Sequence, residues 1–152
     1  MQLKSKNSEL KKRGFIQDSE IPSNTSFSRT ELLSFLNSNN PCERTIAAKI
    51  IARNHDSSFI EGLIKVLSIE KKLYPKIAIS EALGCLGVRA VERCIPWLGK
   101  IGKNQHKILP KKPFKKNNYP LPRDIIARTI CKSGAKALPI LMKDIDITDT
   151  DQ

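Results

Sequence analysis

The chain contains no acidic residue between Glu92 and Asp124, although the same stretch is rich in lysine. Its nine positive charges make up most of the formal net charge of +12, and they belong to Arg93, Lys100, Lys103, Lys107, Lys111, Lys112, Lys115, Lys116 and Arg123. A segment with this many uncompensated charges of one sign repels itself when held compact, so it favours an anionic partner. The simplest alternative is a solvated lysine-rich loop without a ligand.

Aromatic residues and prolines are interspersed with these bases. Trp97 has Arg93 one turn before it and Lys100 about one turn after it, if this region is helical. An aromatic ring flanked by bases suits stacking on a nucleobase or contact with an acidic, partly apolar peptide. We therefore predict that Trp97 lies on the outer part of a helix. Alternatively, the proline-containing segment that follows folds back and covers Trp97 with Phe114 or Tyr119.

Residues that would indicate catalysis are absent from recognisable patterns. The two histidines, His55 and His106, fall in a turn and in the basic stretch. No serine or cysteine stands in a nucleophile motif, and no glycine-rich phosphate loop is present. The four cysteines, at 42, 85, 94 and 131, form no C-x-x-C pair, whereas zinc sites need closely spaced ligands. We predict no catalytic residues, no metal and no cofactor, with Cys85 and Cys94 buried as small apolar residues.

Three segments with the same pattern of paired helices must position these residues. They align at His55, Gly87 and Gly134, where the first helix of each pair should end, and the spacing is 32 and then 47 residues. The extra 15 residues form an insertion at about 103–120. Eleven positions upstream of the aligned residue, each segment has a base: Arg44, Lys76 and Arg123. Four positions upstream each has an aliphatic residue: Ile51, Leu83 and Ile130. Eight positions downstream each has an apolar residue: Leu63, Ile95 and Met142. Such a period is typical of stacked helical units, which bind along extended surfaces.

The expected helices follow from caps and periodicity. A capping box of Ser28 and Glu31 starts a helix, and a second box of Ser58 and Glu61 starts another that runs to about Ile69. The remaining helices are expected at about 42–53, 76–86, 88–101 and 123–133, followed by an inward stripe of Leu138, Leu141, Met142 and Ile145. The polar residues 1–27 read as a basic, flexible arm, and 146–152 as an acidic, frayed tail.

The repeated bases stand at the starts of first helices, where positive charge is unfavourable for the helix dipole. We therefore expect a compensating carboxylate from the neighbouring repeat for Arg44, Lys76 and Arg123. A ligand-binding role is the alternative.

These segments resemble the HEAT-repeat family in its short bacterial and archaeal form. The likeness is clearest in the second segment, where Lys76 is followed by Ala82-Leu83-Gly84-Cys85-Leu86-Gly87 and then by Ala90-Val91. The other two segments match more loosely, with His55 in place of the usual glycine and Ile130-Cys131-Lys132 in place of Leu-Gly-x. The resemblance implies an all-α fold over about residues 28–145, a short right-handed α-α superhelix, or solenoid, of about three to four antiparallel helix pairs.

The function that follows is a non-enzymatic interaction or scaffold module. It would bind an acidic protein partner through the basic insertion and the second helix of the central segment. Sequence-independent nucleic-acid binding through the same residues is the alternative, because phosphates also take lysines. A purely structural subunit, or a lyase-like or DNA-repair member of the family, are further alternatives. The sequence shows no membrane span and no secretory signal, which points to the cytoplasm. So few units predict low stability alone or a homodimer through an exposed solenoid end.

Overall fold

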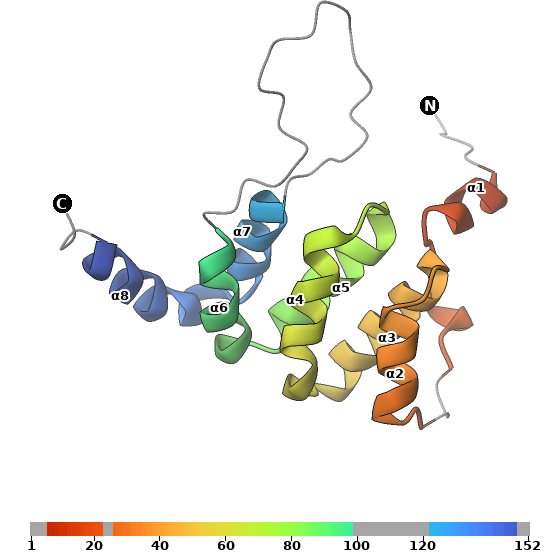
Figure 1. Cartoon of the computed structure of the whole chain (residues 1–152), viewed down its shortest axis with the longest axis horizontal. Helices are drawn as coiled ribbons and strands as arrows, with labels where there is room; N and C mark the ends of the chain where they lie inside the picture. Colours follow the sequence, from red (N-terminus) through yellow and green to blue (C-terminus); the bar gives the residue numbers. More distant parts are fainter. Residues whose placement is uncertain (1–5, 23–25, 99–121, 149–152) are drawn as a thin grey trace, which may run out of the picture.

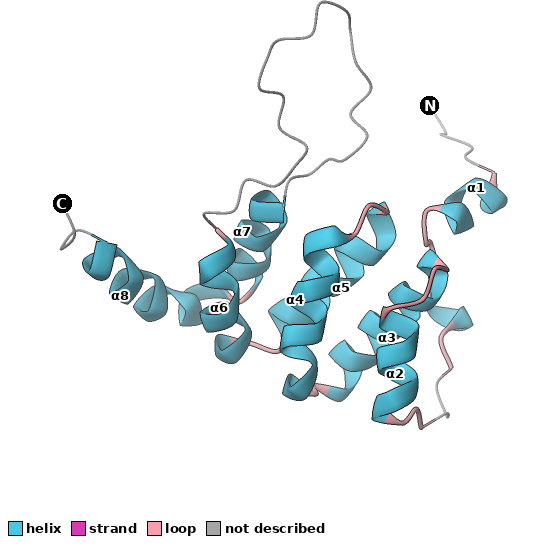
Figure 2. Cartoon of the chain, in the orientation of Figure 1, coloured by secondary structure: helices cyan, strands magenta, loops and turns pink. Residues whose placement is uncertain are grey.

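The computed structural model describes residues 6–22, 26–98 and 122–148, and in these residues every regular element is a helix (Figure 2). The all-α prediction is thus confirmed. None of the described helices has the length and apolar character needed to cross a membrane. The α-helices are α1 (Asn7–Lys12), α2 (Arg29–Leu36), α3 (Pro41–Asn54), α4 (Ile60–Ile69), α5 (Leu73–Cys85), α6 (Val88–Cys94), α7 (Pro122–Lys132) and α8 (Leu138–Thr148). Short 3-10 helices are η1 (Asp18–Glu20), η2 (Ser57–Phe59), η3 (Ile95–Trp97) and η4 (Gly134–Ala137).

Six of these helices form two layers (Figure 1). In the first layer α3 contacts α5 and α5 contacts α7, and in the second layer α2 contacts α4 and α4 contacts α6. Each second-layer helix also packs on the first-layer helix that follows it in the chain, so that α2 lies on α3, α4 on α5 and α6 on α7. The core lies between the layers and is aliphatic, with Leu63, Ile79 and Leu83 fully buried.

The first-layer helices α5 and α7 run in the same direction. The hydroxyls of Ser80 and Thr129 lie 2.8 Å apart in the buried contact, and one turn further along, Gly84 of α5 faces Lys132 of α7. The second contact lies further toward the carboxyl end of both helices than the first, so α5 and α7 are parallel. Their first turns therefore lie at the same edge of the layer. That edge is the one that positions the candidate site described below.

Glycine at position 84 permits this close approach. A Cβ atom at Gly84 would lie 2.9 Å from the Cβ of Lys132, whereas one at Gly62 in α4 would meet nothing nearer than Leu33 Cδ2 at 3.8 Å. We expect Gly84→Ala to lower the free energy of unfolding by about 1–3 kcal/mol, because the helices must move apart. Gly62→Ala should raise it by about 0.5–1 kcal/mol, through the lower entropy of the unfolded chain. Urea unfolding of both variants checks the opposite signs, and equal signs would contradict the packing.

The three aligned helix ends each have a residue with positive φ. His55, Gly87 and Gly134 all have positive φ, at 50°, 70° and 64°. Positive φ is easy for glycine and uncommon for other residues, which explains the glycines at two of these positions. The sign of φ is therefore common to the three aligned positions, although ψ is 34° at His55 and −146° at Gly87.

One of the two predicted capping boxes is present at the start of its helix. The Ser28–Glu31 capping box is confirmed, since the Ser28 hydroxyl accepts from the Glu31 N–H at 3.2 Å and the Glu31 carboxylate accepts from the Ser28 N–H at 2.7 Å. The box expected at Ser58 and Glu61 is wrong. Asp56 caps this start by accepting from the Ser58 N–H at 2.9 Å, and η2 precedes α4. Asp56 and Glu61 are alternative acceptors for the Ser58 N–H, and Asp56 is the one that accepts it.

Residues 6–22, which we expected to belong to a flexible arm, pack on α3 and α5. Ile16 and Ile21 are buried in the core cluster. The Thr45 hydroxyl donates to the carbonyl of Gly14 at 2.8 Å, and the Tyr74 N–H donates to the carbonyl of Arg13 at 3.3 Å. A Cβ at Gly14 would lie 2.6 Å from Pro75 Cδ, so only glycine fits between α3 and α5. This segment covers the amino-terminal end of the helical array.

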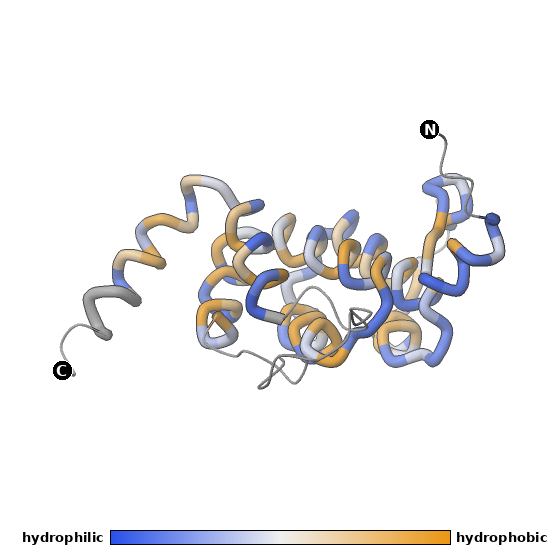
Figure 3. The backbone as a smooth tube through the Cα atoms, turned by 90° about the horizontal axis from the view of Figure 1, so that it is seen from above, coloured by the Kyte–Doolittle hydropathy of each residue, from blue (hydrophilic) through white to orange (hydrophobic). Residues whose placement is uncertain are grey.

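The other end of the array is not covered in this way. The stripe expected to point inward on α8 has Leu138 56% exposed and Met142 65% exposed. At the aligned positions of the first segment, Phe59 is 1% exposed and Leu63 is 0% exposed. Figure 3 shows α8 leaving the body of the molecule with hydrophobic positions along its length. The stripe is thus present, but within the described residues no first-layer helix follows α8 to bury it.

Candidate functional site

Two of the three repeated bases converge on one buried carboxylate, that of Glu70 just after α4. The Glu70 side chain is 2% exposed and pairs with Arg44, whose Nε lies 2.6 Å from Oε2 and whose Nη2 lies 2.9 Å from Oε1. Glu70 Oε1 also accepts from the N–H groups of Lys71 and Lys72, both at 2.8 Å. This fork of charge-assisted bonds at the helix end fixes the connection from α4 to α5.

Lys76, the second repeated base, is also buried at this node. Only 6% of the residue is exposed, and burial lowers the pKa of its ammonium group while the nearby Glu70 carboxylate acts in the opposite direction. The expected compensating carboxylate is therefore present for Arg44. The effect of Glu70 on the pKa of Lys76 agrees with the same expectation. The carboxylate lies in the link between the first and second segments rather than on a separate repeat, so it serves both.

Arg123, the third base, differs from the other two. Its side chain is 44% exposed at the start of α7, and its Nε lies 3.9 Å from the carboxylate of the adjacent Asp124. A contact of this kind between neighbouring surface residues contributes little to stability. Arg123 is thus a surface residue, whereas Arg44 is largely buried.

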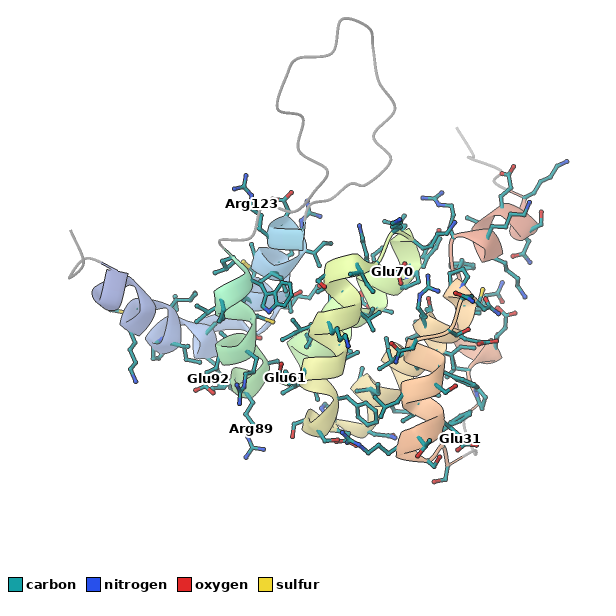
Figure 4. All side chains as sticks on the ribbon, viewed as in Figure 1. Glu31, Glu61, Glu70, Arg89, Glu92 and Arg123 are labelled. Atoms are coloured by element: carbon teal, nitrogen blue, oxygen red, sulfur yellow. The ribbon has the colours of Figure 1, made fainter. Side chains whose placement is uncertain are left out.

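Exposed bases gather at the edge where the first-layer helices begin. Lys71 and Lys72 are exposed beside Glu70, and Arg13 lies with its guanidinium carbon 5.7 Å from the centre of the Tyr74 ring. Figure 4 shows Glu70 and Arg123 at this same edge. We define the basic edge as Arg13, Lys71, Lys72 and Arg123.

The basic insertion joins this edge to the rest of the array. It follows η3 and ends at the first turn of α7, which is the part of α7 that carries Arg123. The predicted partner-binding lysines of the insertion lie outside the described residues, and they are Lys103, Lys107, Lys111, Lys112, Lys115 and Lys116. Lys100, which was expected on the preceding helix with Arg93 and Trp97, also lies outside them. The chain therefore connects the predicted loop charges directly to the described basic edge.

The helix-borne contacts expected on α6 are not assembled into one cationic face. Arg93 is 68% exposed, and its Nε lies 3.4 Å from the carboxylate of Glu61, which is 72% exposed. Arg89 donates to the hydroxyl of Ser57 at 3.5 Å. Figure 4 shows Glu61, Arg89 and Glu92 close together on the lower part of α4 and α6. This face therefore carries both signs of charge.

Trp97 lies against the core rather than projecting as a free ring. It is half-buried and packs on the core cluster, and its helix η3 contacts α7. Pro96 explains the difference, because a proline in a helix interior removes a backbone donor and clashes with the preceding turn. The helix expected at 88–101 is α-helical only to Cys94 and continues as the 3-10 helix η3, which contains Trp97.

The cysteines divide between the interior and the surface. Cys94 is buried, and burial raises the pKa of its thiol to about 12. The expectation that Cys85 is also buried is wrong, because Cys85 lies on an outer stripe of α5 that repeats every four residues with Ile77 and Glu81, all of them exposed. Within the described ranges, no group of three or more histidine, cysteine or acidic side chains could hold a metal ion.

The described helices thus form a two-layer array with exposed cations at one edge. Comparison of the sequence with protein-family models and with curated proteins, and of the fold with solved structures, found no match.

Proposed function

We propose that this chain is a HEAT-like solenoid of about three to four antiparallel helix pairs and acts as a non-enzymatic interaction module. The proposal is supported by the parallel register of α5 and α7 and by the positive φ at the three aligned helix ends. It is also supported by the order in which each second-layer helix packs on the first-layer helix that follows. Stacked units of this kind bind partners along an extended rigid surface. Four free cysteines suit the reducing cytoplasm that we propose as its compartment.

The partner that fits best is an acidic protein segment with apolar side chains, held at the basic edge and by the insertion. One observation carries this choice: Ile69, the last residue of α4, is 71% exposed directly beside the exposed Lys71 and Lys72. An exposed aliphatic side chain between bases offers contact area to a peptide that combines carboxylates with apolar residues. It offers nothing to a phosphate backbone.

Nucleic acid is the less favoured partner for a second reason. Among the described aromatics near the basic edge, Phe15 and Tyr74 pack edge to face with ring centres 5.0 Å apart, and Trp97 is half-buried. Single strands are held chiefly by bases stacking on accessible rings, and this surface provides none of that kind within the described residues. A duplex could use only the charges.

The test compares three labelled anions by fluorescence anisotropy: an acidic amphipathic helical peptide, polyglutamate and a DNA duplex of about 30 base pairs. We expect the peptide to bind more tightly than polyglutamate. The double variant Lys71→Glu/Lys72→Glu should weaken peptide binding at least about tenfold, because two favourable charges become repulsive. Ile69→Ser should weaken binding to the peptide but not to polyglutamate.

The matched control is the double variant Lys136→Glu/Lys143→Glu, which reverses two exposed lysines in η4 and α8, away from the basic edge, and should leave peptide binding nearly unchanged. The proposal fails if this control has the same effect as Lys71→Glu/Lys72→Glu, since binding would then follow net charge alone. It also fails if the duplex binds most tightly, with a salt slope that implies about five or more displaced counterions. That outcome would favour sequence-independent nucleic-acid binding.

A further inference from the structure

The short link between α4 and α5 carries three of the side chains that the proposed function uses. Helix α4 ends at Ile69, and residues 70–72 join it to α5. Ile69 is 71% exposed, and Lys71 and Lys72 are exposed as well. Glu70 lies between them in the chain, yet its side chain is only 2% exposed. One residue of the link is thus buried while its neighbours face the solvent.

The backbone at Glu70 accounts for this difference. Glu70 has φ −63° and ψ 133°, which is extended backbone, and its N–H donates to the carbonyl of Val66 at 2.9 Å at the end of α4. Successive side chains of extended backbone point to opposite sides. Because the Glu70 side chain turns inward, the side chain of Lys71 is directed outward.

The Glu70 carboxylate also holds the backbone of the two residues that follow it. Its Oε1 atom accepts from the N–H groups of Lys71 and Lys72, both at 2.8 Å. Arg44 holds the carboxylate in turn, with Nε 2.6 Å from Oε2 and Nη2 2.9 Å from Oε1. The remaining guanidinium nitrogen, Nη1, donates to the carbonyl of Ser38 at 2.6 Å. A buried fork anchored in α3 therefore fixes the conformation of the link.

Arg44 also prevents Glu70 from competing with a partner for the lysines. A carboxylate beside two lysines in the sequence could pair with their ammonium groups and neutralise them. Arg44 contacts both oxygens of Glu70 instead, and among the described residues neither Lys71 nor Lys72 forms an ion pair through its ammonium group. The exposed surface of the link is therefore positive, although its sequence is Glu-Lys-Lys.

We propose that Arg44 and Glu70 are positioning residues of the binding site, which hold Ile69, Lys71 and Lys72 in the arrangement that meets an acidic, partly apolar protein segment. This inference rests on the proposed function and adds the buried residues on which recognition depends. A link that is fixed before binding loses little conformational freedom when the partner arrives, so the partner binds more tightly than it would to a mobile link.

Two matched variants separate positioning from charge. Arg44→Met/Glu70→Gln and Arg44→Met/Glu70→Met both remove one positive and one negative charge, so both keep the net charge of the parent chain. They differ in the oxygen that can accept from the N–H groups of Lys71 and Lys72, which only glutamine retains. Replacing both members of a buried ion pair leaves neither charge unpaired, so we expect both variants to fold. Circular dichroism and urea unfolding check this expectation.

Fluorescence anisotropy with the labelled acidic amphipathic peptide gives the main result. The Glu70→Met form should bind at least about fivefold more weakly than the Glu70→Gln form. Amide hydrogen exchange of Lys71 and Lys72 should be at least about tenfold faster in the Glu70→Met form, whereas a general loss of stability would not be confined to these two groups. Val91→Ala is the control. It removes a side chain that is 1% exposed in α6, so it should lower stability but change peptide binding by less than about twofold.

Equal peptide affinity of the two matched variants overturns the inference and leaves the proposed function standing. Exchange of the Lys71 and Lys72 N–H groups in the parent chain at the rate of an unfolded peptide also overturns it, and that measurement requires neither a folded variant nor a ligand. If the parent chain does not bind the peptide, the proposed function fails and the inference fails with it. Weaker binding of the Val91→Ala variant, equal to that of the Glu70→Met form, would attribute the effect to stability and overturn the positioning role.

Discussion

Replacing Glu70 with alanine should lower the free energy of unfolding by about 3–5 kcal/mol, a large fraction of the stability of a small domain. The reason is that Arg44, with 13% of its side chain exposed, loses its forked partner, and the buried Lys76 loses its nearby carboxylate. The backbone N–H groups of Lys71 and Lys72 lose their acceptor at the same time. Urea unfolding followed by circular dichroism measures the change.

A matched control separates this buried node from ordinary surface charge. Glu61→Ala removes a carboxylate that is 72% exposed and lies 3.4 Å from Arg93, so it should cost less than about 1 kcal/mol. Salt should reduce the effect of Glu61→Ala and leave that of Glu70→Ala nearly unchanged, because buried pairs are screened little. Similar losses in the two variants would show that Glu70 does not hold α3, α4 and α5 together.

Replacing Ile16 and Ile21 together with alanine should be the second severe change. Each is buried in the core cluster, at 8% and 5% exposed, and removal of a buried isoleucine side chain costs about 2–5 kcal/mol. We expect the double variant to be destabilised by at least about 4 kcal/mol. Thermal unfolding together with urea titration provides the measurement.

Asp18→Asn/Glu20→Gln is the control for this segment. These carboxylates pair at 2.6 Å with Lys49 and Lys11 on the surface, so their removal should leave the core contacts of Ile16 and Ile21 in place. If the isoleucine variant were as stable as the parent chain, residues 6–22 would behave as the flexible arm that the sequence analysis expected. If the surface variant were equally destabilised, the segment would be held by charge rather than by burial.

The sequence was most informative at positions where the local backbone conformation restricts the residue type. Positive φ at the three aligned helix ends needs glycine or a tolerant residue, and Gly87 and Gly134 revealed the register. The Ser28 capping box uses only local hydrogen bonds, so it could also be read directly. Helices α3 and α7 begin and end within one or two residues of the expected positions for the same reason.

Features that depend on packing between distant segments could not be predicted in this way. Ile16 and Ile21 are single aliphatic residues in a polar stretch without a helical period, and their burial depends on helices formed later in the chain. Trp97 was placed by assuming a continuous helix, although Pro96 was a visible signal that the helix would change. The apolar residues of α8 have the helical spacing that is typical of a buried face. Periodicity shows which side of a helix is apolar, but it does not show whether another element covers that side.

The close contact of Gly14 and Phe15 with α5 sets an order of events during synthesis. These two residues leave the ribosome about 60 residues before Tyr74 and Pro75, an interval of roughly 3–12 s at about 5–20 residues per second. Until α5 emerges, the nascent chain displays Phe15 and its neighbouring isoleucines to the surrounding solution. The amino-terminal segment is thus translated first but docks late, and chaperones have their opportunity to bind it during that interval.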